Sequence, residues 1–313
     1  EGNISNYKFI GESSAIIKIK QQIVKIAPTA SRVMIYGESG TGKDIIAKEI
    51  HKNSINKDGP FIILNAALME PENLESELFG IQNNDVDEIG HLEKAENGTL
   101  FIDEVGEMPL QTQAKILRVL TDKNFTKRGG KELIKLNCRI ICSSTKNLEQ
   151  LIIEGSFRKD LFHRLNVVTI KLPNLSERSD DIDSLIDYFT EIFSKENNQK
   201  NTDLKPLIKT KYINYEWPGN IRELRNVIER YSILGEKYDD NNTEEKIDDF
   251  EHKNVISLPL RNARKLFEKN YLQSQINRFD GNISKNAAFR VMERSALHSK
   301  LEHLGITEVE KQR

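Results

Sequence analysis

The segment GESGTGK, Gly37 to Lys43, constrains the fold of this chain more than any other feature of the sequence. It follows the apolar run RVMIY and precedes the amphipathic stretch KDIIAKEI, so it predicts a strand, a tight turn and a helix in succession. Glycines let backbone N–H groups converge on an anion, and the dipole of the following helix favours negative charge. The sequence therefore predicts a phosphate-binding loop, whose residues are Gly37, Glu38, Ser39, Gly40, Thr41, Gly42, Lys43 and Asp44.

Two carboxylates follow this loop in the sequence TLFIDEV, where an apolar strand ends at Asp103 and Glu104. Alone, such a pair is usually a solvated turn, but after a phosphate-binding loop it has a chemical use. Asp103 is placed to hold Mg²⁺, and Glu104 to polarise an attacking water. Asp44 stands where the common pattern has Ser or Thr, and we expect it to reach the metal through a water molecule. Lys43 supplies a mobile positive charge.

Short β-rich runs alternate with helical stretches between about residues 30 and 172, which favours a parallel sheet covered by helices. The predicted strands are RVMIY, FIILN, TLFIDEV, RIICSS and VVTIKLP, and the helices between them are KDIIAKEIHKN and LQTQAKILRVLTD. Residues 1–172 are therefore predicted to form an α/β nucleotide-binding subdomain. Residues 173–235 contain three helical segments, the last after the break WPG, and are predicted to form an all-helical subdomain.

The remaining residues divide by charge. Residues 236–258 begin with the acidic run EKYDDNNTEEKIDDFE and are predicted to be a linker. Residues 259–313 read as helical, and from 261 onwards they carry eleven basic and six acidic residues. A basic helical block is typical of a domain that binds nucleic acid.

The composition of the whole chain excludes several classes of protein. The 46 Lys and Arg residues balance 48 Asp and Glu, so the bulk charge identifies no partner. No apolar run is long enough to span a membrane, and no signal peptide precedes the first predicted element. Cys138 and Cys142 fit neither a metal nor a redox spacing, which indicates buried thiols in a reducing cytoplasm. The six histidines have no metal-ligand spacing, so we predict no metal site made by side chains alone.

Five ordered motifs resemble the AAA+ domain of bacterial enhancer-binding proteins, the activators that remodel sigma-54 RNA polymerase. They are GESGTGKD, LNAALMEPENLESELFG, GTLFIDEVGEMPLQTQAKILRVL, FRKDLFHRLNVV and WPGNIRELRNVIER. The tail GNISKNAAFRVMERSALHSKLEHLGI resembles their Fis-type helix-turn-helix, with wording closest to the NtrX branch of two-component response regulators. The resemblance implies a three-layer P-loop fold with a helical lid, ATP and Mg²⁺ as cofactors, promoter or enhancer DNA as a partner, and a homo-oligomer, either a dimer or a hexamer. It also implies a receiver domain before Glu1, through which a sensor histidine kinase would act.

The resemblance assigns roles to residues of this sequence. Asn65 matches the polar residue that holds the catalytic glutamate in a switch. Arg158 and Arg164 match arginine fingers, which reach the γ-phosphate of a neighbouring subunit, although a surface salt bridge is the ordinary fate of such residues. Arg222 matches the nucleotide sensor of the lid. In the tail, candidates for the DNA-facing side of the recognition helix are Arg294, Ser295, His298 and Lys300.

The sequence departs from the pattern of these activators at three places. Thr145 is followed by Lys146, where the activators have an asparagine that senses the nucleotide. Val291 stands where the NtrX-like tail has a turn glycine, and a β-branched residue resists positive φ. Between Gly80 and Gly90 the activators carry a longer insert with the sigma-contacting motif GAFTGA, whereas this chain has only a polar stretch, NNDVDE, without an apolar period.

Three hypotheses about function follow. In the first, the chain is a DNA-binding regulator whose AAA+ module binds ATP to set its assembly, because the sigma-contacting loop is missing. In the second, it is a ring-forming ATPase that remodels RNA polymerase holoenzyme, since Asp103, Glu104 and both arginines are present. In the third, it is an AAA+ machine that acts on another protein and uses its tail for dimerisation.

Overall fold

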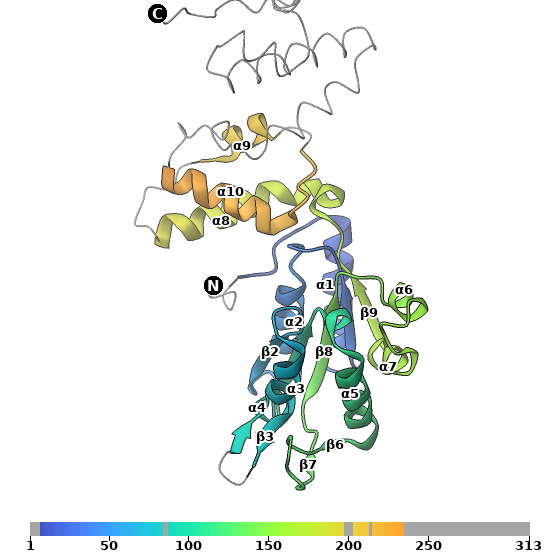
Figure 1. Cartoon of the computed structure of the whole chain (residues 1–313). Helices are drawn as coiled ribbons and strands as arrows, with labels where there is room; N and C mark the ends of the chain where they lie inside the picture. Colours follow the sequence, from blue (N-terminus) through green and yellow to red (C-terminus); the bar gives the residue numbers. More distant parts are fainter. Residues whose placement is uncertain (1–6, 84–86, 197–202, 213–214, 235–313) are drawn as a thin grey trace, which may run out of the picture. The chain divides into compact units, whose positions relative to one another are not determined.

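The computed structural model describes residues 7–83, 87–196, 203–212 and 215–234 (Figure 1). The predicted acidic linker, the helix-turn-helix with its four candidate DNA-facing residues, and Val291 lie outside these described residues. Among the helices that are described, none combines the length and the apolar character needed to cross a membrane.

The centre of the α/β part is a parallel sheet of five strands in the order β2-β5-β8-β1-β9. The strands are β1 (Val33–Tyr36), β2 (Phe61–Asn65), β5 (Thr99–Asp103), β8 (Arg139–Ser144) and β9 (Val168–Lys171). All five predicted strands are confirmed. Their near-continuous apolar character has a simple reason, because helices cover both faces of the sheet.

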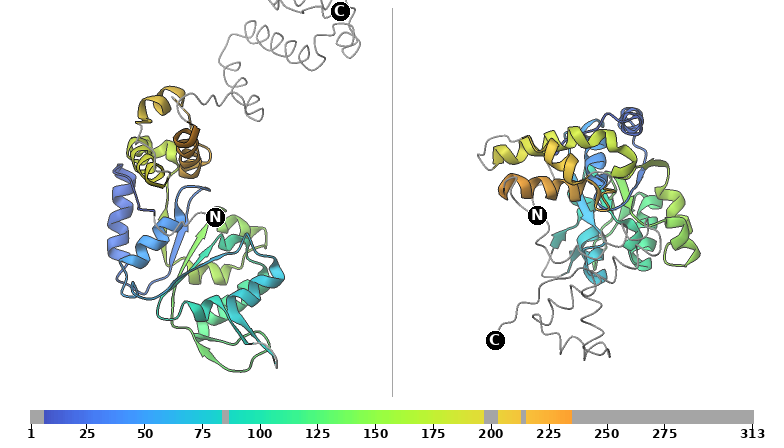
Figure 2. Two further views of the ribbon diagram at one scale, coloured as in Figure 1. Left: turned by 90° about the vertical axis from the view of Figure 1, so that its left-hand side faces the viewer. Right: turned by 90° about the horizontal axis from the view of Figure 1, so that it is seen from above.

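Side-chain alternation along each strand divides the core into two layers. Val33 and Ile35 pack on one face, whereas Met34 between them packs on the other. The helices α1 (Ser14–Ile26) and α2 (Lys43–Lys52) bury their apolar stripes on the first face. The other face is covered by α3 (Pro71–Phe79), α4 (His91–Lys94), α5 (Leu110–Asp122), α6 (Leu148–Ile153) and α7 (Lys159–Leu165). The left-hand view in Figure 2 shows this sandwich, with the blue α1 on the opposite side from the green helices.

Two short antiparallel hairpins extend from the α/β part, at the end that Figure 1 shows remote from the lid helices. One consists of β3 (Gly80–Gln82) and β4 (Asp87–Ile89), the other of β6 (Asn124–Phe125) and β7 (Ile134–Lys135). Asp87 and Glu88, the last two residues of the polar stretch NNDVDE, belong to β4. Backbone pairing with β3 holds this strand, and an apolar period does not report such pairing.

The helical part that follows β9 forms the lid. It consists of the 3₁₀ segment η3 (Leu175–Asp181) and the helices α8 (Ile182–Glu196), α9 (Lys205–Lys211) and α10 (Asn220–Leu234). The chain enters it through a capping box, in which Asn174 and Glu177 satisfy each other's backbone N–H groups. Helix α8 packs against α10, and Phe189, Phe193 and Leu224 are among the buried side chains. The three predicted helical segments are confirmed.

Candidate nucleotide site

The polar residues of the site gather at one edge of the sheet, because parallel strands end on the same side. The strand register places Tyr36 beside Ser144 and Asn65 beside Asp103. The loop after β1 and the carboxylates after β5 are therefore neighbours in space, although β8 lies between the two strands. A conventional AAA+ P-loop arrangement follows from the strand order.

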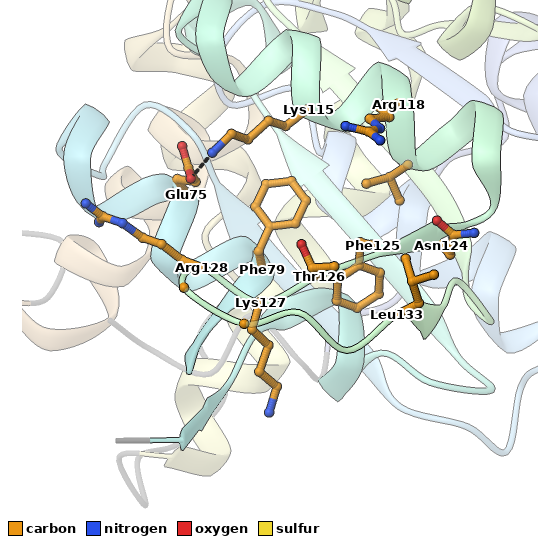
Figure 3. Close-up of a pocket in the computed structure, with 13 residues that line it drawn as sticks. Glu75, Phe79, Lys115, Arg118, Asn124, Phe125, Thr126, Lys127, Arg128 and Leu133 are labelled. Carbon is orange, nitrogen blue, oxygen red and sulfur yellow. Dashed lines mark hydrogen bonds and ion pairs between the residues drawn. The ribbon is translucent and has the colours of Figure 1, made fainter. Parts of the chain in front are cut away.

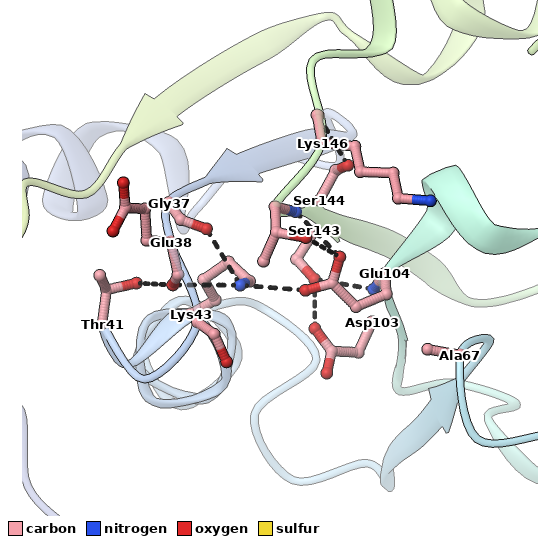
Figure 4. A network of polar contacts seen from close by, with 12 residues as sticks. Gly37, Glu38, Thr41, Lys43, Ala67, Asp103, Glu104, Ser143, Ser144 and Lys146 are labelled. Atoms are coloured by element: carbon pink, nitrogen blue, oxygen red, sulfur yellow. Dashed lines mark hydrogen bonds and ion pairs between the residues drawn. The ribbon is translucent and has the colours of Figure 1, made fainter. Parts of the chain in front are cut away.

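Lys43 lies at the centre of this edge (Figure 4). Its side chain is buried, and its Nζ donates to the carbonyl oxygens of Gly37 (3.1 Å) and Glu38 (3.4 Å). The same Nζ forms an ion pair with Oε1 of Glu104 at 3.1 Å. Gly42 adopts φ +98° just before the helix, a conformation that side chains rarely accept. The loop therefore curls around a buried cation, which is what binding a polyphosphate requires.

Glu104 is held from two sides. In addition to Lys43, both the backbone N–H (2.9 Å) and the hydroxyl (2.8 Å) of Thr145 donate to its Oε2. Burial raises the pKa of Glu104, but the hydrogen bonds from Thr145 and the charge of Lys43 outweigh it, so the net pKa is lowered. The backbone of Glu104 is left-handed, with φ 54°, a strained conformation for a residue with a side chain. Such strain is typical of functional positions.

Asp103 is fixed by neutral donors. The hydroxyl of Ser143 donates to Oδ1, and Nδ2 of Asn65 donates to Oδ2 at 3.0 Å. The resemblance implied that Asn65 holds the glutamate, so the observed contact differs from that expectation: Asn65 ends the strand paired with β5, and its amide reaches the carboxylate directly opposite. The proposed switch role of Asn65 stays a prediction.

Asp44 is the second residue of helix α2 and is partly buried. Burial raises its pKa first, and the negative charge of Asp103 raises it further, while backbone N–H groups and Arg222 oppose the rise. No group of three or more His, Cys, Asp or Glu side chains among the described residues could hold a metal ion without help. A site with one or two carboxylates that completes its shell with phosphate oxygens and water suits Mg²⁺. Asp103 and Asp44 fit that donor set.

The lid contributes Arg222 to the same edge. Its Nη1 donates to the Ser39 hydroxyl at 2.8 Å, so the predicted sensor arginine reaches the phosphate-binding loop across a separation of 183 residues. Arg158 and Arg164 lie elsewhere. Both are exposed on or just before α7, and the side chain of Arg158 binds Asp160 in a bidentate pair at 3.0 and 2.7 Å. Within the described part of the chain, no hydrogen bond or ion pair joins either arginine to the loop.

Three residues of this edge were missed or misjudged by sequence reasoning. Ser143 lies in the predicted strand RIICSS and Asn220 in the motif WPGNIRELRNVIER, but neither was assigned a role. The Ser143 hydroxyl accepts from the N–H of Glu104, and the Asn220 amide donates to the carbonyl of Ser39. Asn147 was not assigned a role either, and its side chain caps α6 by accepting from the N–H groups of Glu149 and Gln150. Lys146 instead pairs with Glu107 at 2.8 Å. The side chain that follows Thr145 therefore pairs with Glu107 rather than with Asp103 or Glu104.

The β3–β4 hairpin is joined to the β6–β7 hairpin by backbone and charge. The N–H of Gln82 donates to the carbonyl of Arg128, and the N–H of Arg128 donates to that of Gly80, both at 2.9 Å. Lys127 is buried and binds Asp87 at 2.6 Å and Glu93 at 3.4 Å. The Asp87 side chain is still 60% exposed, in keeping with its charge, and Lys127 of the second hairpin pairs with it.

A hollow of about 340 Å³ lies beside these hairpins (Figure 3). Phe79, Phe125 and Leu133 give it an apolar wall, and Lys115 and Arg118 of α5 lie at its rim. Lys115 is paired with Glu75 and Arg118 with Asp122. Lys127 and Arg128 also line the hollow, so its charged lining is mainly basic.

Comparison with known proteins identifies the family. The family model described as the sigma-54 interaction domain matches residues 9–171, and the AAA+ ATPase lid domain matches residues 176–249. The nitrogen assimilation regulatory protein NtrX of Azorhizobium caulinodans is 41% identical over 317 residues, which is 96% of this chain and 69% of the relative. The match thus extends over both the nucleotide-binding part and the lid.

Solved structures agree with the sequence comparison. NtrX from Brucella abortus in complex with ADP has a TM-score of 0.72 and 44% identity, covering 95% of this chain and 69% of that one. The same protein in complex with ATP has a TM-score of 0.73 and 44% identity, covering 97% and 70%. With an AAA+ P-loop sheet, a helical lid and these relatives, the chain belongs to the sigma-54 activator family, among its NtrX-like regulatory proteins.

Proposed function

We propose that this chain is an ATP-binding, DNA-binding transcriptional regulator, the effector part of a two-component response regulator. The observation that carries the nucleotide assignment is the buried Lys43 within a curled glycine loop, with Asp103 and Glu104 beside it. NtrX from Brucella abortus has been solved in complex with ADP and with ATP, which supports the same ligands for this chain.

The residues of the site divide the work of binding and hydrolysis. The charged phosphate oxygens of ATP would replace the neutral carbonyls of Gly37 and Glu38 as acceptors for Lys43 and would compete with Glu104 for its charge. Glu104, still held by Thr145, is then free to orient a water molecule. Bound Mg²⁺ would neutralise charge on the phosphates, and Asp103 would hold it, with Asp44 acting through water.

Activation of sigma-54 polymerase is not part of the proposal. Pairing of Gly80–Gln82 with Asp87–Ile89 leaves only residues 83–86 between the strands, too few for a projecting insert that carries GAFTGA. The hairpin is also pinned through Lys127. The remaining role is occupancy of a promoter, with ATP and phosphorylation of a receiver domain by a sensor kinase biasing the oligomeric state.

DNA binding is assigned to residues 259–313, where ERSALHSKLEHLG would be the recognition helix. Residues 1–172, 173–235 and 236–258 would then be the nucleotide-binding subdomain, the lid and the linker, in a cytoplasmic protein. This assignment is supported by the resemblance of the tail to the NtrX branch and by the match to NtrX of Azorhizobium caulinodans, which covers 96% of this chain. Deletion of residues 259–313 is expected to abolish the shift of a promoter fragment in a gel, and a truncated protein that still shifts DNA would refute the assignment.

A second candidate function is a ring-forming ATPase that remodels RNA polymerase. The exposure of Arg158 and Arg164 favours it, because both are available to a neighbouring subunit. ATPase activity measured against protein concentration, with and without promoter DNA, separates the two. We expect ATP binding by the monomer and turnover that rises with concentration, without ATP-dependent melting of a sigma-54 promoter by purified polymerase. Robust melting would overturn the first function and establish the second.

A further inference from the structure

The phosphate-binding loop meets the lid through three consecutive carbonyl oxygens. Each accepts a hydrogen bond from the segment between β9 and the first turn of α10. The pairs are Asn220 Nδ2 to Ser39 O (3.0 Å), Arg222 N to Gly40 O (3.3 Å) and Arg178 Nη2 to Thr41 O (2.9 Å). The lid therefore contacts three successive peptide groups of the phosphate-binding loop through their carbonyl oxygens.

Peptide geometry gives this arrangement a consequence. In a trans peptide the C=O of one residue and the N–H of the next point in opposite directions. Carbonyls turned toward the lid direct the following N–H groups toward the inside of the loop, where Thr41 N already meets Glu38 O at 3.4 Å. Converging N–H groups are what bind phosphate in such a loop. The orientation of the anion-binding groups thus depends on lid contacts.

Asn220 is suited to this task at both ends of its amide. It is 1% exposed, its φ is 53°, and its Oδ1 accepts from Leu175 N at 2.8 Å while Nδ2 donates to the loop. Asparagine tolerates positive φ better than most residues. The neighbouring backbone is in close contact, since a Cβ on Gly40 would lie 2.2 Å from Gly219 O.

Arg178 is an expensive residue to bury. It is 2% exposed, and its Nε and Nη1 have no hydrogen-bond partner among the described residues. Burial lowers its pKa, and the charge of Asp181 only partly opposes this. Asp181 is itself engaged by the N–H groups of Glu12 (2.6 Å) and Ser13 (2.7 Å). The one hydrogen bond that the guanidinium donates among the described residues is directed to the loop, which indicates that this buried cation holds the loop's geometry.

We propose that Asn220 and Arg178 are positioning residues, which act through the carbonyls of Ser39 and Thr41 to keep the phosphate-binding loop in its ligand-binding shape. The docked lid then sets the affinity of the loop for the phosphate groups of ATP and ADP. This inference rests on the proposed nucleotide binding, and it adds two residues that touch the loop rather than the ligand.

The test removes the side-chain N–H donor of Asn220 and keeps its oxygen acceptor. Asn220→Asp retains the Oδ1 acceptor and tolerates φ 53°, but it turns a carboxylate toward Ser39 O. Its affinity for fluorescent ATP and ADP analogues is expected to fall about tenfold for each. Arg178→Lys, which keeps the charge and loses the guanidinium, is expected to give a smaller fall in the same direction. Lys209→Met is the matched control, because it removes an exposed lid bond to Asp183 (2.7 Å) remote from the loop.

A second readout needs no nucleotide. Amide hydrogen exchange of residues 39–43 is expected to be faster in Asn220→Asp than in the wild type or Lys209→Met, with the exchange of the sheet strands unchanged. Unchanged exchange of the loop amides overturns the positioning role, and so does unchanged affinity in a protein that binds ATP. If the wild type binds no nucleotide while loop exchange still responds, the proposed function fails and the positioning role stands.

Discussion

Two buried lysines, at different ends of the α/β part, show how one residue type serves opposite purposes. Lys43 is 7% exposed and Lys127 is 8% exposed. Lys43 shares its charge between one carboxylate and two carbonyl oxygens, so it has partners that a phosphate can replace. Lys127 lies between two carboxylates, and its hydrogen bond to Asp87 is the main reason that its pKa is raised. Lys43 can therefore exchange its partners for a phosphate, whereas Lys127 joins two carboxylates of the fold and has a structural role.

The glycines near the two lysines repeat the contrast. A Cβ on Gly42 would find its nearest neighbour at 3.7 Å, so space is left at this position of the loop, whereas Gly40 is closed on the lid side by Gly219 O. A Cβ on Gly90 would lie 2.3 Å from Gly80 N and 2.4 Å from Phe79 C, so the base of the β3–β4 hairpin is closed by backbone against backbone. The phosphate-binding loop thus keeps free space at Gly42, whereas the β3–β4 hairpin is closed at its base. Related activators are expected to carry a projecting loop in place of this hairpin.

The largest expected effect is on the turnover of ATP at the nucleotide site. Glu104→Gln keeps the shape of the side chain but removes the carboxylate that would orient water. Turnover of ATP, measured as released phosphate at high protein concentration, is expected to fall about 10²–10⁴-fold, with ATP affinity retained. Retained turnover would mean that another group activates the water, and the contrast between the two lysines would lose its catalytic meaning.

A side chain at the crowded base of the β3–β4 hairpin is expected to lower the stability of the protein and to leave its affinity for ATP unchanged. Gly90→Ala places a methyl group against the Gly80 backbone and is expected to lower the free energy of unfolding by about 2–4 kcal/mol in urea titrations. Gly155→Ala is the control for backbone strain without a steric conflict, because Gly155 has φ +76°, whereas Gly90 has φ −81°, and a Cβ on Gly155 meets nothing within 4 Å. A folded Gly90→Ala protein that has lost ATP affinity would show that the two ends are coupled.

Replacing each lysine in turn by alanine is expected to separate nucleotide binding from stability. Lys43→Ala is expected to weaken ATP binding at least tenfold, about 1.4 kcal/mol, by removing a charge-assisted phosphate contact. Lys127→Ala is expected to leave that affinity unchanged and to lower stability, since Asp87 and Glu93 lose their shared cation. Titration of both variants with a fluorescent ATP analogue checks this. Equal affinities of Lys43→Ala and the wild type would refute it.

The smallest expected effect is the pH dependence of Glu104. Its pKa is lowered in the folded state from an ordinary value of 4.5, so its contribution to stability is present above that value and is lost as the pH falls through the folded pKa. The difference in unfolding free energy between the wild type and Glu104→Gln is therefore expected to shift against the wild type in acid. A difference that is constant between neutral pH and about pH 3 would contradict the paired state of Glu104.

The predicted strands and the phosphate-binding loop were accessible from sequence because their signals are local. RVMIY, GESGTGK and KDIIAKEI are contiguous, and the period of their apolar residues reports burial directly. Arg178 shows the opposite case. Its segment, SERSDD, looks like a solvated charged turn, yet its guanidinium binds Thr41 across 137 residues. The contact partner of Asn65 was equally inaccessible, because strand register, rather than motif, put its amide opposite Asp103.

By itself, the sequence determined the secondary structure of the sheet, the identity of the loop and its carboxylates, and the family, since each depends on residues close together along the chain. Only the tertiary structure decided which partner each buried charge takes: Glu104 for Lys43, the β4 and α4 carboxylates for Lys127, and a loop carbonyl for Arg178. The physical reason is that a charge removed from water must be matched by whatever polar group the packed fold brings within reach. Those pairings join distant segments, and no local pattern encodes them.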